Sequence, residues 1–459
     1  MKSDEIKGLI KEQQLFFDSG VTLPLSFRKD ALKKLYSLIE ENEALLQEAL
    51  KADLGKSAFE ADMCEIRLTL SEISYMLKNL KHFAKKKRVH TPLSQAISSS
   101  YTLPSPYGNV LIMSPWNYPI LLTLDPLVDA IAAGNTAIIK PSAYSMNVSS
   151  LLNKLISSVF NKEYIAVVEG GREENQTLLD EHFDYIFFTG SKSVGRFVMS
   201  KATEHLTPVT LELGGKSPVI VCEDADISLS ARRIVFGKFL NLGQTCVAPD
   251  FLLVPRTIHD KFLEALKIEI VKQYSSTPLT NPDYGKIISK KHFDRISLLI
   301  DRKKVVFGGN SNPKTLQIEP TILDNVTLSD AVMKDEIFGP VMPIIIYDTL
   351  QDAIQIIKSF DHPLAFYVFT KSKKRADKLI NSIGFGGGCI NDTIIHLATS
   401  QMGFGGFGES GMGSYHGKSG FDTFSHNKSI VDKKRIIDLP MRYAPYKKFY
   451  HQLIKLFLK

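Results

Sequence analysis

The sequence predicts an α/β protein that contains two tandem units, each built on a largely parallel sheet. Two observations lead to this prediction. From Tyr107 onward, short apolar runs alternate with amphipathic stretches of helical spacing, which is the pattern of βαβ units. A second series of the same kind runs from Pro218 to Asn391, and the 459 residues are enough for about two to four domains.

The expected elements follow the chain in order. Residues 31–50 and 68–83 carry apolar side chains at helical spacing, and residues 81–100 form a basic, then Ser-rich connection. The first α/β unit is expected to contain strands at 110–113, 136–139, 164–168 and 185–188, with helices up to 133 and at 145–159. The second is expected to contain strands at 218–221, 341–347 and 364–370, with helices at 228–239, 259–273 and 350–360.

Composition excludes several classes of protein. Hydrophobic residues make up 44% and charged residues 23% of the chain, whereas a disordered chain has far fewer apolar residues. No run of 18 apolar residues is present, so we expect no membrane-spanning helix. The charged N-terminus does not resemble a secretory signal, and the four cysteines match no zinc motif. We therefore expect a reduced, cytoplasmic protein without a metal site.

The net charge of +7 is concentrated near the C-terminus. Residues 432–459 contain eight Lys and Arg but only two Asp, so the rest of the chain is close to neutral. A protein that binds nucleic acid carries its basic residues on a face of the folded body. The sequence therefore argues against a nucleic-acid partner.

A glycine-containing turn between a strand and a helix is the first candidate for a cofactor site. Gly190 permits the turn, Ser191 follows it, and Gly195 lets the helix pack closely against its neighbours. A helix N-terminus attracts anionic phosphate. The stretch lacks the complete G-x-G-x-x-G pattern, so an ordinary strand–helix turn is the alternative.

Glu212 and Cys246 are the candidates for covalent chemistry. Glu212 ends an apolar strand, and Cys246 lies in a loop between Gly243 and Pro249. A nucleophilic thiolate with a desolvated carboxylate as base is suited to acyl chemistry. The alternative is a buried structural cysteine and a buried, ion-paired glutamate.

Asn117 is the candidate for stabilising an oxyanion. It follows the first expected strand of the α/β series and lies between Trp116, the one tryptophan of the chain, and Tyr118. An amide N–H held in place can donate to a developing oxyanion. A turn-forming Asn close to a proline is the alternative.

Together these segments resemble the aldehyde dehydrogenase superfamily. The resemblance lies in Ser114-Pro-Trp-Asn-Tyr-Pro, Phe187-Phe-Thr-Gly-Ser, Glu212-Leu-Gly-Gly-Lys, Gly243-Gln-Thr-Cys, Glu336-Ile-Phe-Gly-Pro and a late Gly-Phe-Gly loop, in the order of the family. The stretch from Ser410 to Lys418, with Thr423-Phe-Ser-His, looks like the class 3 branch. The resemblance covers residues 5–445 and implies a Rossmann-like cofactor domain, a catalytic α/β domain and a small β oligomerisation unit.

The resemblance also implies a division of the chain into segments. The NAD(P)-binding domain would comprise residues 1–84 and 107–210, the catalytic domain 211–392, the oligomerisation unit 85–106 and 393–433, and a basic amphipathic tail 434–459. A homodimer that forms by sheet addition is the expectation for this branch.

The roles implied by the resemblance are those of an enzyme that oxidises an aldehyde to its acid. Cys246 would attack the aldehyde carbon, and the Asn117 side chain with the Cys246 backbone N–H would hold the oxyanion of the thiohemiacetal. Hydride transfer to nicotinamide would leave a thioester, and Glu212 would activate the water that hydrolyses it. The presence of this base favours hydrolysis over acyl transfer to coenzyme A. Glu336 is the alternative base.

NAD or NADP is the cofactor that the resemblance implies. The expected cofactor residues are Lys140 at the adenosine ribose, Gly190, Ser191 and Gly195 near the adenine half, Glu336 at the nicotinamide ribose, and Phe338 packed against the same part of the cofactor. Many family members carry a Glu three residues after the lysine, where this chain has Ala143. Since that carboxylate would repel a 2′-phosphate, its loss predicts use of both NAD and NADP.

The substrate is expected to be an apolar aldehyde: medium or long aliphatic, aromatic or isoprenoid (polyene). Tyr118 is expected to flank it because it neighbours Asn117, and His416 lies in the class 3 motif, where a structural role is the alternative. Two other functions compete with this one. The chain could be a membrane-peripheral binding protein on an inactive dehydrogenase scaffold, or a thioesterase that needs no nicotinamide.

The C-terminal tail predicts a basic amphipathic helix. Its apolar positions are Tyr446, Phe449, Tyr450, Leu453, Leu456 and Phe457, with Lys447, Lys448, Lys455 and Lys459 among them. Three interpretations remain open. The helix packs on its own or a partner subunit, lies on the anionic inner face of the membrane, or covers the mouth of the substrate tunnel, as similar class 3 enzymes for fatty aldehydes suggest.

Overall fold

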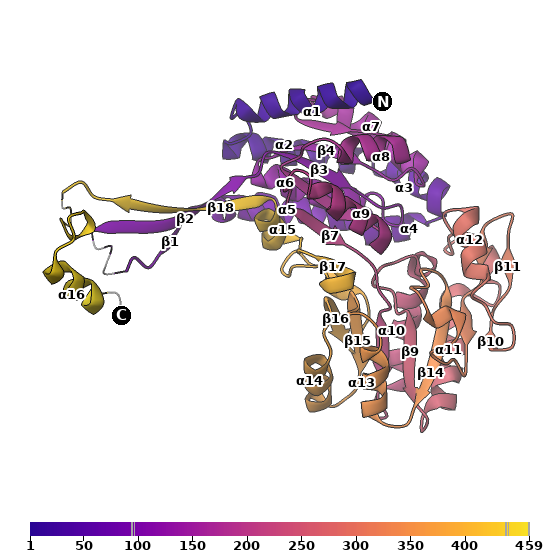
Figure 1. Ribbon diagram of the computed structural model, residues 1–459. Helices are drawn as coiled ribbons and strands as arrows, with labels where there is room; N and C mark the ends of the chain where they lie inside the picture. Colours follow the sequence, from indigo (N-terminus) through magenta and orange to yellow (C-terminus); the bar gives the residue numbers. More distant parts are fainter. Residues whose placement is uncertain (93–94, 96, 437, 439, 458–459) are drawn as a thin grey trace.

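The computed structural model describes residues 1–92, 95, 97–436, 438 and 440–457. Figure 1 shows an α/β body that contains the N-terminus, a second α/β body, and a long arm that projects from the first body. The predicted α/β class with two sheets is confirmed. The division of the chain into cofactor, catalytic and oligomerisation segments stays a prediction, and residues 93, 94 and 96 of its arm segment lie outside the described residues.

The chain begins with a layer of helices. These are α1 (Ser3–Asp18), α2 (Leu25–Glu41), α3 (Glu43–Leu54), α4 (Ala58–Ala61), the π-helical turn η1 (Asp62–Ile66) and α5 (Arg67–Phe83). The apolar spacing that predicts one helix over 31–50 is divided at Asn42 between α2 and α3. Leu32, Leu35 and Ile39 of α2 are buried against the body, so the expected helical spacing does mark the packed face.

The first sheet has the strand order β17-β7-β6-β3-β4-β5. Its strands are β3 (Asn109–Met113), β4 (Thr136–Lys140), β5 (Ile165–Val167), β6 (Tyr185–Thr189), β7 (Val209–Glu212) and β17 (Gly411–Met412), all parallel except β17. The helices between them are α6 (Leu121–Ala133), α7 (Met146–Val159), α8 (Arg172–Leu179) and α9 (Lys192–Ala202).

Both faces of this sheet are covered, which explains its continuous apolar strands. Val110 and Ile112 of β3 pack into the core that α2, α5 and α6 share. Leu111 and Met113, on the opposite face, pack with α1, α8 and α9. Because the strands are parallel, their carboxyl ends lie at one edge of the sheet, and this is the edge where ligands bind in α/β proteins.

The second sheet has the order β10-β13-β14-β9-β8-β15-β16. Its strands are β8 (Pro218–Val221), β9 (Phe251–Pro255), β10 (Val305–Phe307), β13 (Thr321–Leu323), β14 (Val341–Tyr347), β15 (Ala365–Phe369) and β16 (Gly387–Ile390), and only β10 runs antiparallel. Its main helices are α10 (Ile227–Phe239), α11 (His259–Tyr274), α12 (Lys290–Ser297), α13 (Leu350–Lys358) and α14 (Lys373–Ser382). A small hairpin, β11 (Ser311–Asn312) and β12 (Gln317–Ile318), lies beside it.

The arm is a three-stranded antiparallel sheet. It consists of β1 (Lys87–Val89), β2 (Ser98–Pro106) and β18 (Ser425–Lys433), and β18 follows the short helix α15 (Gly417–Thr423). β18 pairs with the whole of β2. The helix predicted after Pro445 is α16 (Lys448–Phe457), which lies at the outer end of the arm (Figure 1). Residues 458 and 459 of that prediction lie outside the described residues, and no described helix is long and apolar enough to cross a bilayer.

Candidate active site

Cys246 lies where two cavities meet. One, of about 240 Å³, opens along the edge of the first sheet. Seven predicted site residues line it: Asn117, Gly190, Ser191, Glu212, Cys246, Glu336 and Phe338. The other cavity, of about 160 Å³, is lined mostly by apolar side chains and also reaches Cys246. The cysteine therefore faces a polar cavity on one side and an apolar cavity on the other.

The loop that carries Cys246 has an unusual backbone. After α10, Asn241, Leu242 and Gly243 have φ angles of 49°, 53° and 69°, in the left-handed region that non-glycine residues rarely adopt. A Cβ at Gly243 would lie 2.5 Å from the carbonyl oxygen of Gly339, so this position accepts only glycine. Such backbone strain is typical of functional sites, and here it turns the chain so that Cys246 enters both cavities.

The titration of the site is governed by burial. Burial, with the charges of Glu336 and Glu212, raises the pKa of the Cys246 thiol, so the thiol is protonated in the free protein at neutral pH. Burial also raises the pKa of Glu336 to about 8 and that of Glu212 well above its usual range. Neither carboxylate oxygen of Glu212 has a hydrogen-bond partner among the described residues. A desolvated, unpaired carboxylate of this kind is a strong proton acceptor.

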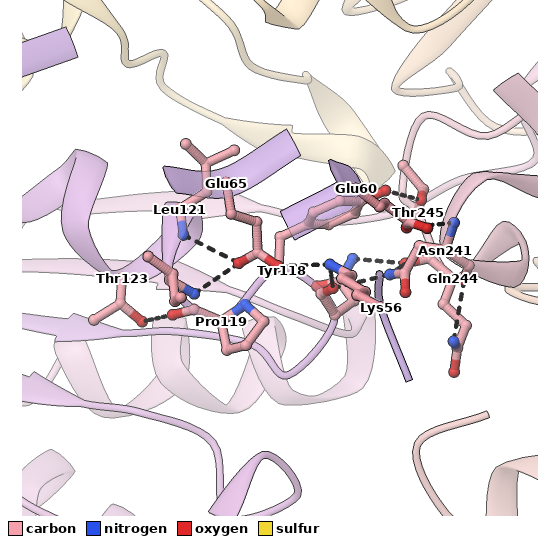
Figure 2. A network of polar contacts seen from close by, with 12 residues as sticks. Lys56, Glu60, Glu65, Tyr118, Pro119, Leu121, Thr123, Asn241, Gln244 and Thr245 are labelled. Atoms are coloured by element: carbon pink, nitrogen blue, oxygen red, sulfur yellow. Dashed lines mark hydrogen bonds and ion pairs between the residues drawn. The ribbon is translucent and has the colours of Figure 1, made fainter. Parts of the chain in front are cut away.

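Asn117 contacts the loop that carries Cys246. Its Nδ2 donates to the backbone carbonyl of Gln244 at 3.0 Å. Its own carbonyl accepts from Asn241 Nδ2 and Lys56 Nζ, each at 2.9 Å. Figure 2 shows this polar network, in which Glu60 Oε1 also accepts from the Asn241 N–H at 3.0 Å.

The residues that hold Asn117 could not be recognised from the sequence. Lys56, Glu60 and Glu65 follow a helix with no motif around them, and Lys56 is 61 residues from Asn117 along the chain. The available signal was one Lys and two Glu in a stretch that is otherwise largely apolar. Nothing in their spacing indicated that they lie beneath the loop of Asn117.

The predicted cofactor residues separate into two groups. Gly190 and Ser191 lie at the N-terminus of α9, and the Glu336 carboxylate lies against Gly214. Phe338 packs on Trp116 with ring centroids 5.4 Å apart. These residues line the polar cavity, which lies beside the N-terminus of α9, a place where anionic groups are stabilised.

Lys140 and Gly195 are not among the residues that line the polar cavity. Gly195 lies within α9, and a Cβ there would be 2.7 Å from the Leu213 side chain, so it allows close helix packing. Lys140 ends β4, and its Nζ donates to the carbonyls of Pro141 and Gly170 at 2.8 and 2.7 Å. Burial lowers the pKa of Lys140 to about 8.

The apolar cavity contains both predicted substrate residues. Tyr118 and His416 line it together with Leu121, Phe236, Ile394 and Phe404. The Tyr118 hydroxyl is 2.6 Å from Thr245 Oγ1, next to the nucleophile. Burial lowers the pKa of His416 to about 4, so its imidazole is neutral and adds no charge to the cavity. No group of three His, Cys, Asp or Glu in the described part of the chain could hold a metal ion.

Comparison with known proteins finds relatives over the whole chain. The model described as the aldehyde dehydrogenase family matches residues 1–430. The 4,4′-diaponeurosporen-aldehyde dehydrogenase of Staphylococcus aureus is 47% identical over 451 residues, which are 98% of each protein. The dimeric, NADP-preferring aldehyde dehydrogenase of Canis lupus familiaris is 43% identical over 444 residues, 96% of this chain and 98% of that protein.

The fold is also similar to solved structures. A substrate-bound structure of Staphylococcus aureus AldH superposes with a TM-score of 0.97 at 46% sequence identity and covers 99% of each chain. The predicted aldehyde dehydrogenase fold is thereby confirmed.

Proposed function

Since the chain belongs to the aldehyde dehydrogenase family, and so oxidises aldehydes with NAD or NADP, we propose that its substrate is a long apolar aldehyde of the isoprenoid or fatty type. One observation carries this proposal. The apolar cavity ends at Cys246, and the polar cavity, which is lined by four of the six predicted cofactor residues, begins there. A hydrocarbon chain that enters the first cavity would bring its aldehyde carbon to the sulfur.

The proposed reaction begins at Cys246. Its sulfur attacks the aldehyde carbon as the thiol gives its proton to a nearby carboxylate, and a thiohemiacetal forms. The oxyanion accepts hydrogen bonds from Asn117 Nδ2 and the Cys246 backbone N–H. When bound, the nicotinamide of NAD or NADP supplies the hydride acceptor, and the thioester of Cys246 is left.

Glu212 acts in the second half of the reaction. Its carboxylate takes a proton from a water molecule, and the oxygen attacks the thioester carbon. The carboxylic acid leaves, and Cys246 returns to the thiol. The raised pKa of Glu212 makes it a stronger base near neutral pH than an exposed carboxylate. Glu336 lines the same cavity and is the alternative base.

The residues present fit a dinucleotide. Gly214 leaves room for the Glu336 carboxylate, because a Cβ there would overlap its oxygens. Glu336 would hold the nicotinamide ribose and Phe338 would pack beside it. Gly190 and Ser191 would lie near the adenine half at the N-terminus of α9, with Lys140 toward the adenosine ribose.

The choice of a long apolar aldehyde has two supports. The relative from Staphylococcus aureus is named for a 4,4′-diaponeurosporen-aldehyde. The substrate cavity of this chain presents Leu, Ile and Phe side chains and a neutral His416, so it offers no charge to a polar substrate. The intact set of Cys246, Glu212 and Asn117 argues against an inactive scaffold, and the polar cavity argues against a thioesterase alone.

The test is the formation of reduced cofactor with aliphatic aldehydes of rising length, with benzaldehyde and with a polyene aldehyde. Each is measured with NAD and with NADP. We expect kcat/KM to rise with chain length, and Cys246→Ala to lower turnover by about 10³-fold or more. Cys389→Ala is the matched control and keeps its activity, because Cys389 lines neither cavity. A maximum with short aldehydes or benzaldehyde would overturn the proposal.

We further propose that the protein is a homodimer joined through the arm. β18 leaves an unpaired edge with exposed Ile430 and Val431, and such an edge pairs readily with another strand. The relative from Canis lupus familiaris is named as dimeric. Sedimentation equilibrium is expected to give the mass of two chains, and the mass of one chain would refute this assembly.

The proposed site of α16 is an anionic membrane surface. Tyr446, Phe449 and Ile454 are exposed beside Lys447, Lys448 and Lys455, as in helices that lie in the membrane interface. The full chain is expected to float together with anionic vesicles at low salt, and a chain that ends at residue 433 is expected not to float. If the full chain does not float either, packing of α16 on a partner subunit or over the mouth of the substrate tunnel is favoured instead.

A further inference from the structure

Lys56 and Glu65 form a buried ion pair beneath the loop of Asn117. Lys56 lies between α3 and α4, and Glu65 lies in the π-helical turn η1. Lys56 Nζ is 2.6 Å from Glu65 Oε1, and both side chains are fully buried. Neither residue lines either of the cavities that reach Cys246, so the pair does not touch substrate or cofactor.

The pair contacts both ends of the turn that carries Asn117. Lys56 Nζ donates to the Asn117 carbonyl at 2.9 Å and lies 3.9 Å from the centre of the Tyr118 ring. Glu65 Oε2 accepts from the backbone N–H groups of Ile120 and Leu121 at 2.8 and 3.3 Å. Figure 2 shows Lys56 and Glu65 together with Tyr118, Pro119 and Leu121 of this turn.

A buried ion pair needs an explanation other than stability. Two charges lose their hydration on burial, and apolar residues of the same volume often stabilise a fold equally well. The pair instead fixes the position of one short turn, because each of its charged groups is hydrogen-bonded to backbone groups of that turn. The π-helical turn that carries Glu65 is a rare element that is common at functional sites.

We propose that Lys56 and Glu65 are positioning residues that hold the Asn117 amide at the place where it stabilises the oxyanion. This inference rests on the proposed role of Asn117. Lys56 fixes the backbone of Asn117 itself, and Glu65 fixes the first turn of α6 three residues later. The Asn117 side chain then needs no adjustment when the oxyanion forms.

The test replaces the pair by neutral residues of similar size. Lys56→Met with Glu65→Gln removes both charges and the donor to Asn117, while the Gln oxygen still accepts from Ile120 or Leu121. We expect kcat to fall by about 10-fold to 100-fold with unchanged KM for NAD. Alkylation of Cys246 by iodoacetamide, followed by mass spectrometry of its peptide, is expected to keep its rate, because this reaction forms no oxyanion.

Two control variants separate positioning from folding. Lys56→Gln with Glu65→Gln also removes both charges but keeps a side-chain N–H donor, and it is expected to recover part of the lost kcat. Lys304→Met with Asp330→Asn removes an ion pair of the second body whose two residues line neither cavity, and it is expected to keep kcat. If neither double variant at 56 and 65 folds, the pair is structural and the proposal is wrong.

A double-mutant cycle with Asn117→Ala decides how the pair acts. If the pair works through Asn117, adding Lys56→Met with Glu65→Gln to Asn117→Ala lowers kcat no further. If the pair variant and Asn117→Ala each lower kcat independently, so that their effects multiply when they are combined, the proposal is wrong. If Asn117→Ala alone keeps kcat, the oxyanion role of Asn117 in the proposed function is wrong. If the pair variant nevertheless loses kcat, the pair acts by a route other than Asn117, and this inference is wrong as well.

Discussion

The Asn117 side chain donates one Nδ2 hydrogen to the carbonyl of Gln244, two residues before Cys246, at 3.0 Å. An amide nitrogen carries two hydrogens, so this bond orients the group and leaves the second hydrogen for another acceptor. The loop that carries Asn117 and the loop that carries Cys246 are thus joined by a direct hydrogen bond. The proposed oxyanion site would therefore be assembled already in the free protein.

Asn117→Ala removes the side-chain donor and is expected to lower kcat by about 10²-fold to 10³-fold, the effect of losing one oxyanion donor. Binding of NAD is expected to stay within about twofold, measured by quenching of the single tryptophan, Trp116, in the polar cavity. A variant that binds NAD normally and keeps more than about half of the wild-type kcat would refute the role of Asn117.

Glu212→Gln is expected to separate the two halves of the reaction. Cys246 still forms the thioester, so reduced cofactor appears in a burst equal to the enzyme concentration. Hydrolysis then slows by about 10²-fold to 10⁴-fold, because the general base is absent. Stopped-flow absorbance measures both phases. If Glu336→Gln produces the burst and Glu212→Gln does not, Glu336 is the base.

The same carboxylate predicts a pH dependence. Burial raises the pKa of Glu212 well above its usual range, so the base is protonated at acidic pH and ionises only as the pH rises. The rate of thioester hydrolysis in the wild type is expected to go on increasing above the pH at which an exposed carboxylate is fully ionised, and then to level off. A rate that is flat from pH 5 upward would mean that Glu212 is not the base.

Much of the fold could be predicted because the strands are buried on both faces. The expected strand at 341–347 matches β14, and the strand at 136–139 differs from β4 by one residue. Continuous apolar runs mark such strands directly. The break at Asn42 between α2 and α3 could not be predicted, since the apolar spacing continues across it.

The candidate site could be predicted only where a motif marks it. Cys246, Glu212 and Asn117 lie in recognisable sequence motifs and line one cavity. Lys56, between α3 and α4, and Glu65, in η1, are far from them in sequence, and their proximity to Asn117 depends on how the helical layer packs on the first sheet. Contacts between such distant segments are set by the tertiary fold, which no local pattern reports.

Lys140 predicts a pH dependence of NADP binding. Burial lowers its pKa to about 8, so the ammonium is charged below this pH and neutral above it. The Kd for NADP is expected to increase by about tenfold between pH 7 and pH 9, and the Kd for NAD by less, since NAD lacks the 2′-phosphate. Trp116 quenching measures both. Lys140→Met is expected to bind NADP weakly at every pH, and a persisting pH dependence in that variant would exclude Lys140 as its source.

Ala143 predicts which cofactors the wild type accepts. It lies three residues after Lys140 and is exposed, so no carboxylate at this position opposes a 2′-phosphate. Comparable kcat/KM with NAD and NADP is expected, and a preference for NAD above a hundredfold would refute this prediction. Ala143→Glu adds one negative charge, whose repulsion at about 4 Å in a hydrated site is worth about 1 to 2 kcal/mol. The kcat/KM with NADP should therefore fall by about tenfold while that with NAD changes little. Ala143→Gln has the same size without the charge. If it lowers the NADP activity as much as Ala143→Glu does, size rather than charge selects the cofactor at this position.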